Sequence, residues 1–315
     1  MSSITQAFVL GAGLGKRLLP LTEELPKPLV PIFQKPLITF AFDHLIAAGC
    51  TKFVVNTHLH PTCFAEVFPS ARYCDRQLDF KFEPILLETG GGIKNAESSL
   101  GSEPFIVYSG DILTDIDLPP LIEEHFRAGN DVTLALRQTS LASGIALEKG
   151  RVVDINNRYG HVGKYDFANV SVWNRDVFQR IAPGKKISFV PILGQWIGQG
   201  GKIGGVVHNE GIWFNIGSPA EYLEVHRTIT AQKWKPNYVR KPDWPVSIAD
   251  DAVVDSSARL FGFHSLGAGS RIGAGAVLED TIVWAGGEVA SGAALRNCVV
   301  RSGKTAAGNH AGAVI

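Results

Sequence analysis

The sequence predicts an α/β protein with a doubly wound, mainly parallel sheet, followed by a short coil of repeated turns. From residue 5 to about residue 233, strand-like and helix-like segments alternate, which is typical of parallel strands joined by crossover helices. Beyond residue 245, aliphatic residues recur every six positions, a period that fits neither a helix nor a flat strand. We therefore expect three regions: a domain over 1–233, a linker over 234–245 and a repeat domain over 246–315.

The first region shows this alternation in order. Segments with strand character lie at Ala7–Leu10, Phe53–Val55, Phe105–Tyr108 and Asp131–Leu136. Segments with helical spacing lie at Leu37–Ala48 and Leu118–Ala128, and each is followed by a glycine, Gly49 or Gly129, which suits the end of a helix. Ligands of doubly wound sheets bind beyond the carboxyl ends of the strands, so we expect the functional residues there.

The last region has a sequence period of six. Its aliphatic positions are Ile248, Val254, Leu260, Leu266, Ile272 and Leu278 and, after a slip of one residue, Val283, Val289 and Leu295. The pattern resembles the left-handed β-helix of hexapeptide-repeat proteins, in which the chain turns a corner at each repeat. We expect this domain to be a scaffold or an oligomer contact, with its open end at Ile315 covered in a homo-oligomer.

The composition argues against several classes of function. The 315 residues include 30 basic and 30 acidic side chains, so no basic surplus indicates a nucleic-acid partner. The four cysteines form no CxxC pair and have no zinc-site spacing. No apolar run is long enough to span a bilayer, and the N-terminus has no signal-peptide pattern. These observations predict a soluble, cytoplasmic protein without a membrane partner.

A glycine-rich turn, GAGLGKR (Gly11–Arg17), follows the first apolar run. A Walker A loop would need one more residue between the glycines, and a Ser or Thr where Arg17 stands. A dinucleotide-binding fingerprint begins at Gly11 but is not completed. The turn is weak evidence by itself, because tight turns after strands use glycine anyway.

The turn continues into a longer pattern. Arg17 is followed by Pro20-Leu21-Thr22 and then by Pro26-Lys27-Pro28-Leu29. This combination resembles the sugar-phosphate nucleotidylyltransferases, which join a nucleoside triphosphate to a sugar 1-phosphate and release pyrophosphate. The resemblance extends along the chain, and it implies that residues 1–233 form a Rossmann-like nucleotidyltransferase domain.

The chemistry of this segment agrees with bringing two anions together. Backbone N–H groups of a glycine turn can approach a triphosphate closely. Arg17 offers a fork of donors for the β- and γ-phosphates, and Lys27, between two prolines, offers a point charge for the α-phosphate and the sugar phosphate. We predict Arg17 and Lys27 as catalytic residues. The nucleotide-binding residues predicted in this turn are Leu10, Gly11, Ala12, Gly13 and Gly15.

A second glycine loop, LLETGGGIKNA (Leu86–Ala96), leads into a predicted helix. The resemblance makes it the nucleobase loop, with Glu88, Thr89 and Gly90 against the base and Glu83 as a base-contacting side chain. A carboxylate could accept hydrogen bonds from uracil or from guanine, so Glu83 does not identify the base. The ETGGGI sequence is most similar to the N-acetylmuramate-1-phosphate uridylyltransferase branch, and guanylyltransferases carry similar loops. UTP is therefore the favoured donor and GTP the next.

A magnesium site is implied by two further motifs. Asp111 ends the apolar run Phe105–Tyr108 in SGD, where a hard oxygen ligand would suit Mg²⁺ beside phosphate oxygens. The family's second metal aspartate lies in a W-x-D-I-G-T-P motif, which here reads WFNIGSP with Asn215 in place of the Asp. Some relatives have Asn at this position, so Mg²⁺ is the expected cofactor, and its affinity should be weaker than with two carboxylates.

The sugar side is less specific. Gly144 matches a glycine that relatives hold near the sugar, and Asn169 stands where relatives usually have Gly. Two alternative functions stay open at this point. The repeat domain could transfer an acyl group with His264 or His310 as a base, or the chain could be a non-catalytic relative that binds a nucleotide sugar.

Overall fold

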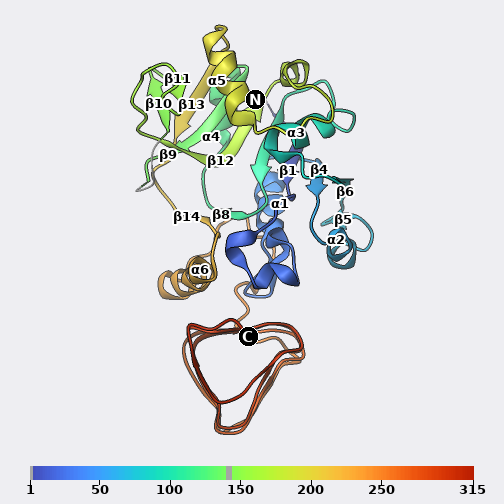
Figure 1. The fold of residues 1–315 in the computed structure, drawn as a ribbon, viewed down its shortest axis with the longest axis vertical. Coiled ribbons are helices and arrows are strands. Elements are labelled where there is room, and N and C mark those ends of the chain that lie inside the picture. The colour runs from blue at the N-terminus through green and yellow to red at the C-terminus, as the bar shows by residue number, and fades with distance from the viewer. Residues whose placement is uncertain (1–2, 140–143) are drawn as a thin grey trace. The chain divides into compact units, whose positions relative to one another are not determined.

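A computed structural model describes residues 3–139 and 144–315 (Figure 1). The chain forms two compact units. The sheet unit comprises Met1–Leu14 and Ile38–Trp213, and the coil unit comprises Gly15–Leu37 and Phe214–Ile315. This grouping differs from the division at residues 233 and 246 that follows the change of sequence pattern. The physical reason is that residues 15–37 and helix α6 (Pro219–Gln232) pack with the repeat region within one unit.

The sheet unit is built on ten strands in the order β10-β11-β13-β9-β12-β7-β1-β4-β6-β5. Their bounds are β1 Gln6–Leu10, β4 Lys52–Thr57, β5 Arg72–Tyr73, β6 Arg76–Phe82, β7 Phe105–Ser109, β9 Val132–Arg137, β10 Ile145–Glu148, β11 Arg151–Ile155, β12 Asp166–Trp173 and β13 Ile203–Val207. The helices are α1 Ile38–Ala47, α2 Pro61–Val67, α3 Glu88–Asn95, α4 Leu118–Arg127 and α5 Phe189–Gly198, and a short strand β8 covers Ile112–Thr114.

The predicted α/β fold is confirmed, and the strand directions divide the sheet. Neighbours β7, β1, β4 and β6 run parallel, whereas β12 runs antiparallel to both β7 and β9. Within the parallel half, β1, β4 and β7 are buried on both faces, as in β1, where Ala7, Phe8 and Val9 have no exposed surface, whereas β6 is partly exposed. The sheet is therefore mixed overall, and its parallel half carries the glycine turn.

The predicted helices form where the apolar spacing placed them. Helix α4 buries Leu118, Leu121, Ile122 and His125, a spacing of three and four residues that lines one face. Helix α1 ends just before Gly49, whose φ of 99° is a conformation that other residues rarely adopt. No helix among residues 3–139 and 144–315 is both long and apolar enough to cross a membrane.

The coil unit contains stacked short parallel strands, in an arrangement consistent with a short β-helix. Figure 1 shows the chain winding repeatedly around a triangular section. One stack is β15-β17-β19-β22 (Val253–Val254, Arg271–Ile272, Glu288–Val289, Thr305–Ala306). A second is β16-β18-β20-β23 (Arg259–Leu266, Val277–Val283, Ala294–Arg296, Asn309–Ala311), with β21 (Val299–Val300) beside β18. The remaining strands are β2 Pro31–Ile32 and β3 Lys35–Pro36, while β14 Trp213–Asn215 lies at the chain boundary of the units.

The six-residue period produces the interior of this coil. Its buried cluster includes the hexad positions Leu266, Ile272, Leu278, Val283, Val289 and Leu295. Strand register places Ile272 between Val254 and Val289, so aliphatic residues of successive turns lie in contact along the coil. The slip of one residue after Leu278 keeps Val283 inside, since both residues are fully buried in the same cluster. Pattern and core therefore agree from Leu266 to Leu295, whereas Val254 and Leu260 are only partly buried and Ile248 is exposed.

Candidate active site

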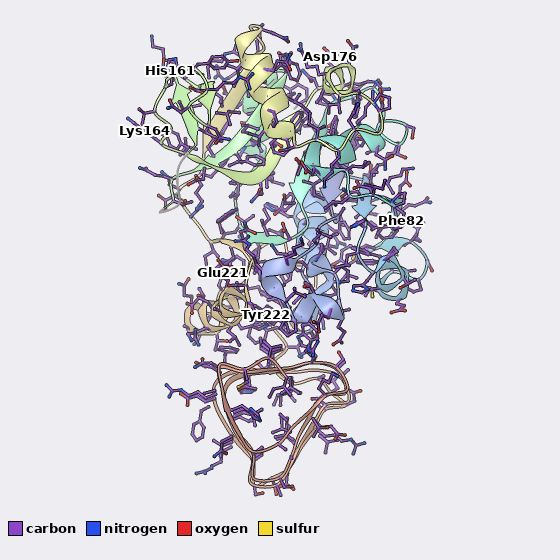
Figure 2. All side chains as sticks on the ribbon, viewed as in Figure 1. Phe82, His161, Lys164, Asp176, Glu221 and Tyr222 are labelled. Atoms are coloured by element: carbon purple, nitrogen blue, oxygen red, sulfur yellow. The ribbon has the colours of Figure 1, made fainter. Side chains whose placement is uncertain are left out.

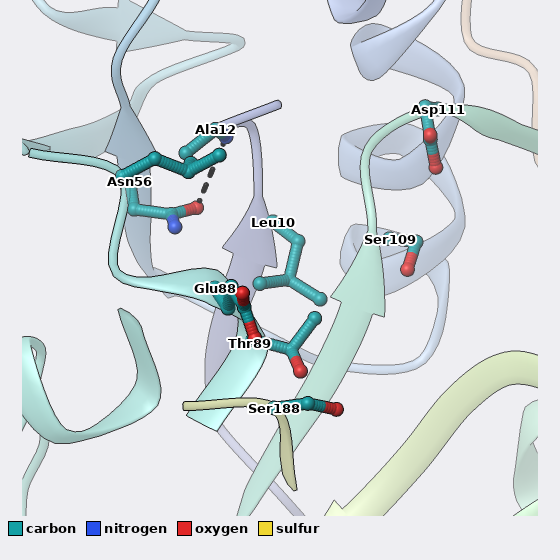
Figure 3. Close-up of a pocket in the computed structure, with 9 residues that line it drawn as sticks. Leu10, Ala12, Asn56, Glu88, Thr89, Ser109, Asp111 and Ser188 are labelled. Carbon is teal, nitrogen blue, oxygen red and sulfur yellow. Dashed lines mark hydrogen bonds between the residues drawn. The ribbon is translucent and has the colours of Figure 1, made fainter. Parts of the chain in front are cut away.

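A cavity of about 320 Å³ lies in the sheet unit at the carboxyl ends of β1, β4 and β7 (Figure 3). It is lined by Leu10, Ala12, Asn56, Leu86, Glu88, Thr89, Ser109, Asp111 and Ser188. The carboxyl ends of neighbouring parallel strands meet at one edge of the sheet, which explains why residues so distant in the sequence converge here. The cavity brings together five predicted site residues, namely Leu10, Ala12, Glu88, Thr89 and Asp111.

The glycine turn is held by a side chain from the neighbouring strand. Asn56, near the end of β4, accepts hydrogen bonds at Oδ1 from the backbone N–H groups of Gly11 (2.9 Å) and Ala12 (3.3 Å). Figure 3 shows the bond from Ala12. A Cβ at Gly11 would lie 2.6 Å from the Asn56 carbonyl oxygen, so a side chain there would force the turn away from β4. Glycine is needed at position 11 for this close approach.

Glu83 lies behind Asn56 rather than in the cavity. The side chain is fully buried; its Oε1 accepts from Asn56 Nδ2 (2.8 Å) and its Oε2 from the Leu87 backbone N–H (2.9 Å). Both oxygens accept from protein donors, and Glu83 is not among the residues that line the cavity, so the base contact stays a prediction. Glu83 instead fixes which way the Asn56 amide points, and it ties the first glycine loop to the second.

The third glycine of ETGGGI completes this arrangement. A Cβ at Gly92 would lie 2.8 Å from Asn56 Nδ2 and 2.9 Å from Glu83 Oε1, closer than real Cβ atoms approach other atoms. Sequence reasoning missed Asn56. The available signal was a polar residue directly after the apolar run Phe53–Val55, at the strand end where ligands of such sheets bind.

The second glycine loop is pinned by the segment that precedes α5. Backbone N–H groups of Gly90 and Gly91 both donate to the Ile187 carbonyl (2.8 and 3.0 Å), and Thr89 Oγ1 accepts from the Phe189 N–H (3.1 Å). Gly90 is buried, whereas Glu88 and Thr89 line the cavity. Glu88 has a φ of 61°, an uncommon conformation for a residue other than glycine. The loop thus presents Leu86, Glu88 and Thr89 to the cavity and uses its glycines for packing.

Asp111 supplies a carboxylate at the tip of β7, and Ser109 adds a hydroxyl from the last residue of that strand. A group of three or more His, Cys, Asp or Glu side chains that could hold a metal does not occur among residues 3–139 and 144–315. Mg²⁺ does not require such a group, because it binds through one or two carboxylates together with substrate phosphates and water. The residues around Asp111 therefore fit Mg²⁺ bound with a phosphate ligand, and not a cage made only of protein ligands.

The predicted catalytic cations lie in the coil unit. Lys27 begins a short 3₁₀ helix between Pro26 and Pro28, and its side chain is 8% exposed. Its Nζ donates to Asn215 Oδ1 at 3.1 Å, a contact between residues 188 positions apart. The second predicted metal residue is thus in direct contact with Lys27. Its amide oxygen has a further lone pair for another partner.

Arg17 is exposed, and it lies close to the backbone of Gly217 in the WFNIGSP motif. A Cβ at Gly217 would be 2.8 Å from an Arg17 guanidinium nitrogen and 3.0 Å from Glu221 Oε2. Glu221, labelled on α6 in Figure 2, accepts from the Gly217 N–H at 2.8 Å. The motif therefore lies beside Arg17, and its glycine leaves room for the guanidinium.

The remaining predicted residues lie outside the cavity lining. In the coil unit, Gly15 has a φ of 57° and its carbonyl accepts from Thr22 Oγ1 at 3.0 Å. In the sheet unit, a Cβ at Gly144 would lie 2.5 Å from Asn156 Oδ1, and Asn169 has a φ of 64° where the register between β12 and β9 shifts. Gly13 also does not line the cavity. The sugar-binding roles of Gly144 and Asn169 stay predictions.

The chain has relatives with established names. It matches the family described as Nucleotidyl transferase over residues 6–232. It is 28% identical over 287 residues to the mannose-1-phosphate guanylyltransferase of Mycobacterium tuberculosis, covering 89% of this chain and 80% of that protein. It is also 28% identical over 240 residues to the N-acetylmuramate alpha-1-phosphate uridylyltransferase of Neisseria meningitidis, covering 73% of this chain and all of that protein.

Solved structures agree at the level of the fold. A putative glucose-1-phosphate thymidylyltransferase from Bacillus anthracis superimposes with a TM-score of 0.60 at 18% identity, covering 68% of this chain and 91% of that one. The family match covers more than half of the chain and includes both glycine loops, Asp111 and the Lys27–Asn215 contact. The chain therefore belongs to the nucleotidyl transferase family.

Proposed function

We propose that this protein transfers a nucleotidyl group from a nucleoside triphosphate to a sugar 1-phosphate, giving a nucleotide sugar and pyrophosphate. The observation that carries the proposal is the cavity that Ala12 of the first glycine turn, Glu88 and Thr89 of the second loop, and Asp111 line together. The names of two enzymes that are each 28% identical to the chain, a guanylyltransferase and a uridylyltransferase, support the same reaction class.

In this reaction a phosphate oxygen of the sugar 1-phosphate attacks the α-phosphorus, and the bond from the α-phosphorus to the leaving pyrophosphate breaks. The protein need not supply a nucleophile, so its contribution is positioning and charge stabilisation. Lys27 would bind the α-phosphate and the incoming phosphate, and Arg17 the β- and γ-phosphates. Both cations would then act on charge that moves during the reaction, which raises the rate rather than the affinity.

We further propose that Mg²⁺ is the cofactor, with Asp111 and Asn215 as its protein ligands. When bound, the ion would neutralise charge on the phosphates of the triphosphate. Support comes from the donor chemistry, a carboxylate at the strand tip together with an amide oxygen. Replacing one carboxylate by an amide removes a negative charge, so we expect Mg²⁺ to half-saturate at a higher concentration than in relatives with two aspartates.

For the donor, we propose UTP first and GTP second. The ETGGGI loop supports UTP through its similarity to the muramate uridylyltransferase branch. The guanylyltransferase match, which covers 89% of this chain, supports GTP. Leu86, Glu88, Thr89 and Ser188 line the cavity, and we propose that they take part in base recognition.

The test is pyrophosphate release by the purified chain with Mg²⁺. Each of UTP, GTP, CTP, ATP and dTTP is paired with the 1-phosphates of N-acetylmuramate, N-acetylglucosamine, glucose, mannose and heptose. We expect turnover with a UTP or GTP pair. Nucleotide binding without pyrophosphate release across the panel would contradict the proposal and favour a non-catalytic nucleotide-sugar sensor. Acyl transfer from acetyl-CoA, measured alongside, tests the bifunctional alternative.

We also propose that the protein is a homo-oligomer that assembles through its C-terminal coil, and that it acts in the cytoplasm. Light scattering on the purified chain measures the mass of the assembly. A mass equal to that of one chain, 34.0 kDa, at micromolar concentration would contradict the oligomer.

A further inference from the structure

Within the coil unit, three hydrogen bonds hold the C-terminal part of the segment that carries Arg17 and Lys27. The Tyr222 hydroxyl donates to the Pro31 carbonyl (2.5 Å), Trp244 Nε1 donates to the Ile32 carbonyl (3.0 Å), and His226 Nε2 accepts from the Phe33 N–H (3.3 Å). Tyr222 is labelled on α6 in Figure 2. These bonds fix residues 31–33, which follow Lys27 by only a few positions.

The coil itself holds the same region. Gln34 Nε2 donates to Ser265 Oγ and to the Leu266 carbonyl, both at 3.0 Å, and Trp284 Nε1 donates to the Tyr222 hydroxyl at 3.1 Å. Residues of β16 and of the turn after β18 therefore belong to the support of this segment. The contacts given so far act after Lys27, and they leave the stretch between Arg17 and Lys27 to be held by other groups.

Arg301 contacts that stretch. Its Nη1 donates to Glu23 Oε2 (2.9 Å) and to the Pro20 carbonyl (3.2 Å). The same Pro20 carbonyl accepts from the Glu23 backbone N–H (3.1 Å) and so closes the short 3₁₀ helix Leu21–Glu23. Arg301 thus binds both ends of this turn.

The guanidinium of Arg301 is itself held in place. Its side chain is 17% exposed, whereas that of Glu23 is 59% exposed. Both the Arg301 backbone N–H (2.9 Å) and its Nε (3.4 Å) donate to the Ile315 carbonyl. An ion pair with one exposed partner adds little to folding stability. The fixed guanidinium binds the Pro20 carbonyl, which lies between Arg17 and Lys27 in the sequence. It therefore affects the geometry of this segment more than the stability of the fold.

We propose that Arg301, on the C-terminal coil, is a positioning residue for nucleotidyl transfer: it fixes the turn between Arg17 and Lys27 and thereby aligns the two cations. The expected effect of Arg301 on the reaction rate rests on the proposed function. Its effect on the turn rests only on its contacts with Pro20 and Glu23. The coil would then influence the reaction only by positioning residues 15–37, and none of its own side chains would contact the reacting groups.

The first test compares Arg301→Ala with a matched control, Arg296→Ala. Arg296 is an arginine of the same coil in an exposed ion pair with Glu279 (3.5 Å), and that pair lies outside residues 15–37. We expect Arg301→Ala to lower kcat about tenfold, because displaced catalytic groups lose rate steeply, while KM for the triphosphate changes less than twofold. Arg301→Lys should recover part of kcat. Equal kcat values for Arg301→Ala and Arg296→Ala would overturn the inference.

The second test does not depend on turnover. Hydrogen exchange of the Glu23, Glu24 and Leu25 amides reports the turn directly, since these amides donate to the Pro20 and Leu21 carbonyls. We expect at least tenfold faster exchange there in Arg301→Ala and unchanged exchange in Arg296→Ala. Unchanged exchange in both variants overturns the inference even if the enzyme is active. If exchange is faster in Arg301→Ala but the protein shows no turnover, the result confirms that Arg301 holds the turn. It then contradicts only the proposed function.

Discussion

The two units hold their functional groups in different ways. In the sheet unit, the groups around the cavity are bonded to one another, with Asn56 joining the glycine turn to Glu83 and Glu83 joining the second loop. In the coil unit, Arg17 and Lys27 lie on a short irregular segment. Hydrogen bonds from helix α6 and from the coil hold that segment in place. The sheet unit thus contains a preformed cavity, whereas the coil unit holds residues 15–37 through contacts with helix α6 and the coil.

This difference suggests a division of labour. A preformed cavity contributes equally to substrate and transition state, and so it governs the affinity for the triphosphate. If Arg17 and Lys27 act on charge that develops in the transition state, as proposed, they govern turnover. Changes at Arg17, Lys27 and their support should therefore appear in kcat, and changes in the cavity lining, apart from the proposed metal ligand Asp111, should appear first in KM.

The strongest test of this division is Lys27→Ala. We expect kcat to fall by about 10²–10³-fold, because a preorganised charge at the reacting phosphates is lost, while the dissociation constant for the triphosphate changes little. Steady-state kinetics and calorimetric titration measure the two quantities. Lys304→Ala, which removes an exposed lysine of the coil unit outside residues 15–37, should leave both unchanged. Near-normal turnover in Lys27→Ala would remove the basis for its catalytic role.

Asp111→Asn tests whether the sheet unit also carries a group that acts on turnover. We expect turnover to fall about a hundredfold at fixed Mg²⁺ and to recover in part as Mg²⁺ is raised, because an amide binds the ion more weakly than a carboxylate. The measurement is pyrophosphate release over a range of Mg²⁺ concentrations. An unchanged Mg²⁺ dependence would exclude Asp111 as a ligand.

Asn56→Asp tests the hydrogen-bonded cavity itself. The substitution replaces the donor to Glu83 by a second carboxylate at about the same 2.8 Å, which is unfavourable unless one of them is protonated. We expect KM for the triphosphate to rise about tenfold at pH 8, with a smaller rise at pH 6. Asn95→Asp, the same change at the exposed end of α3, is the control. A rise in both variants would show a general charge effect instead.

The smallest expected effect concerns His226, which helps to hold residues 31–33 by accepting from the Phe33 N–H. Burial lowers the pKa of His226 to about 4, and its neutral ring accepts from the Phe33 N–H while Nδ1 donates to the Tyr222 carbonyl. Between pH 6.5 and about 4, the unfolded chain binds a proton at this site and the folded chain does not. The free energy of unfolding should therefore fall with falling pH, by at most about 1.4 kcal/mol per pH unit from this residue.

His226→Gln keeps an acceptor and a donor but does not titrate, so its unfolding free energy should depend less on pH over this range. Denaturant unfolding at several pH values measures the slope. His44 in the sheet unit, whose pKa burial lowers to about 3, is present in both proteins, so the difference between them isolates His226. Equal slopes would mean that His226 is not held neutral.

Much of the fold could be predicted from local patterns. The apolar run at Ala7–Leu10 became β1, and the hexads from Leu266 to Leu295 became the interior of the coil, because in both cases burial follows directly from residue type and period. Asp111 and Thr89 were found by motif, and both line the cavity. Glu83 was placed against the base by analogy, and nothing local in the sequence shows that Asn56 and Leu87 occupy its two oxygens.

The grouping of residues 15–37 with the coil was also beyond local patterns. It depends on hydrogen bonds between residues separated by 188 to 281 positions, such as those from Lys27 to Asn215 and from Arg301 to Pro20. A change of sequence period marks where a repeat begins, but it says nothing of which distant segment packs against it. The linker at 234–245 shows the same limit, because Trp244 is almost fully buried and donates to Ile32.

These separations also bear on how the chain folds during synthesis. Residues 15–37 leave the ribosome about two hundred residues before Trp244, and 281 residues separate Pro20 from Arg301. Contacts of such high contact order form slowly. Until they form, the apolar side chains of Leu29, Ile32 and Phe33, which are buried in the native fold, lack their final partners. We expect this segment to stay incompletely packed until residues up to Arg301 have been synthesised.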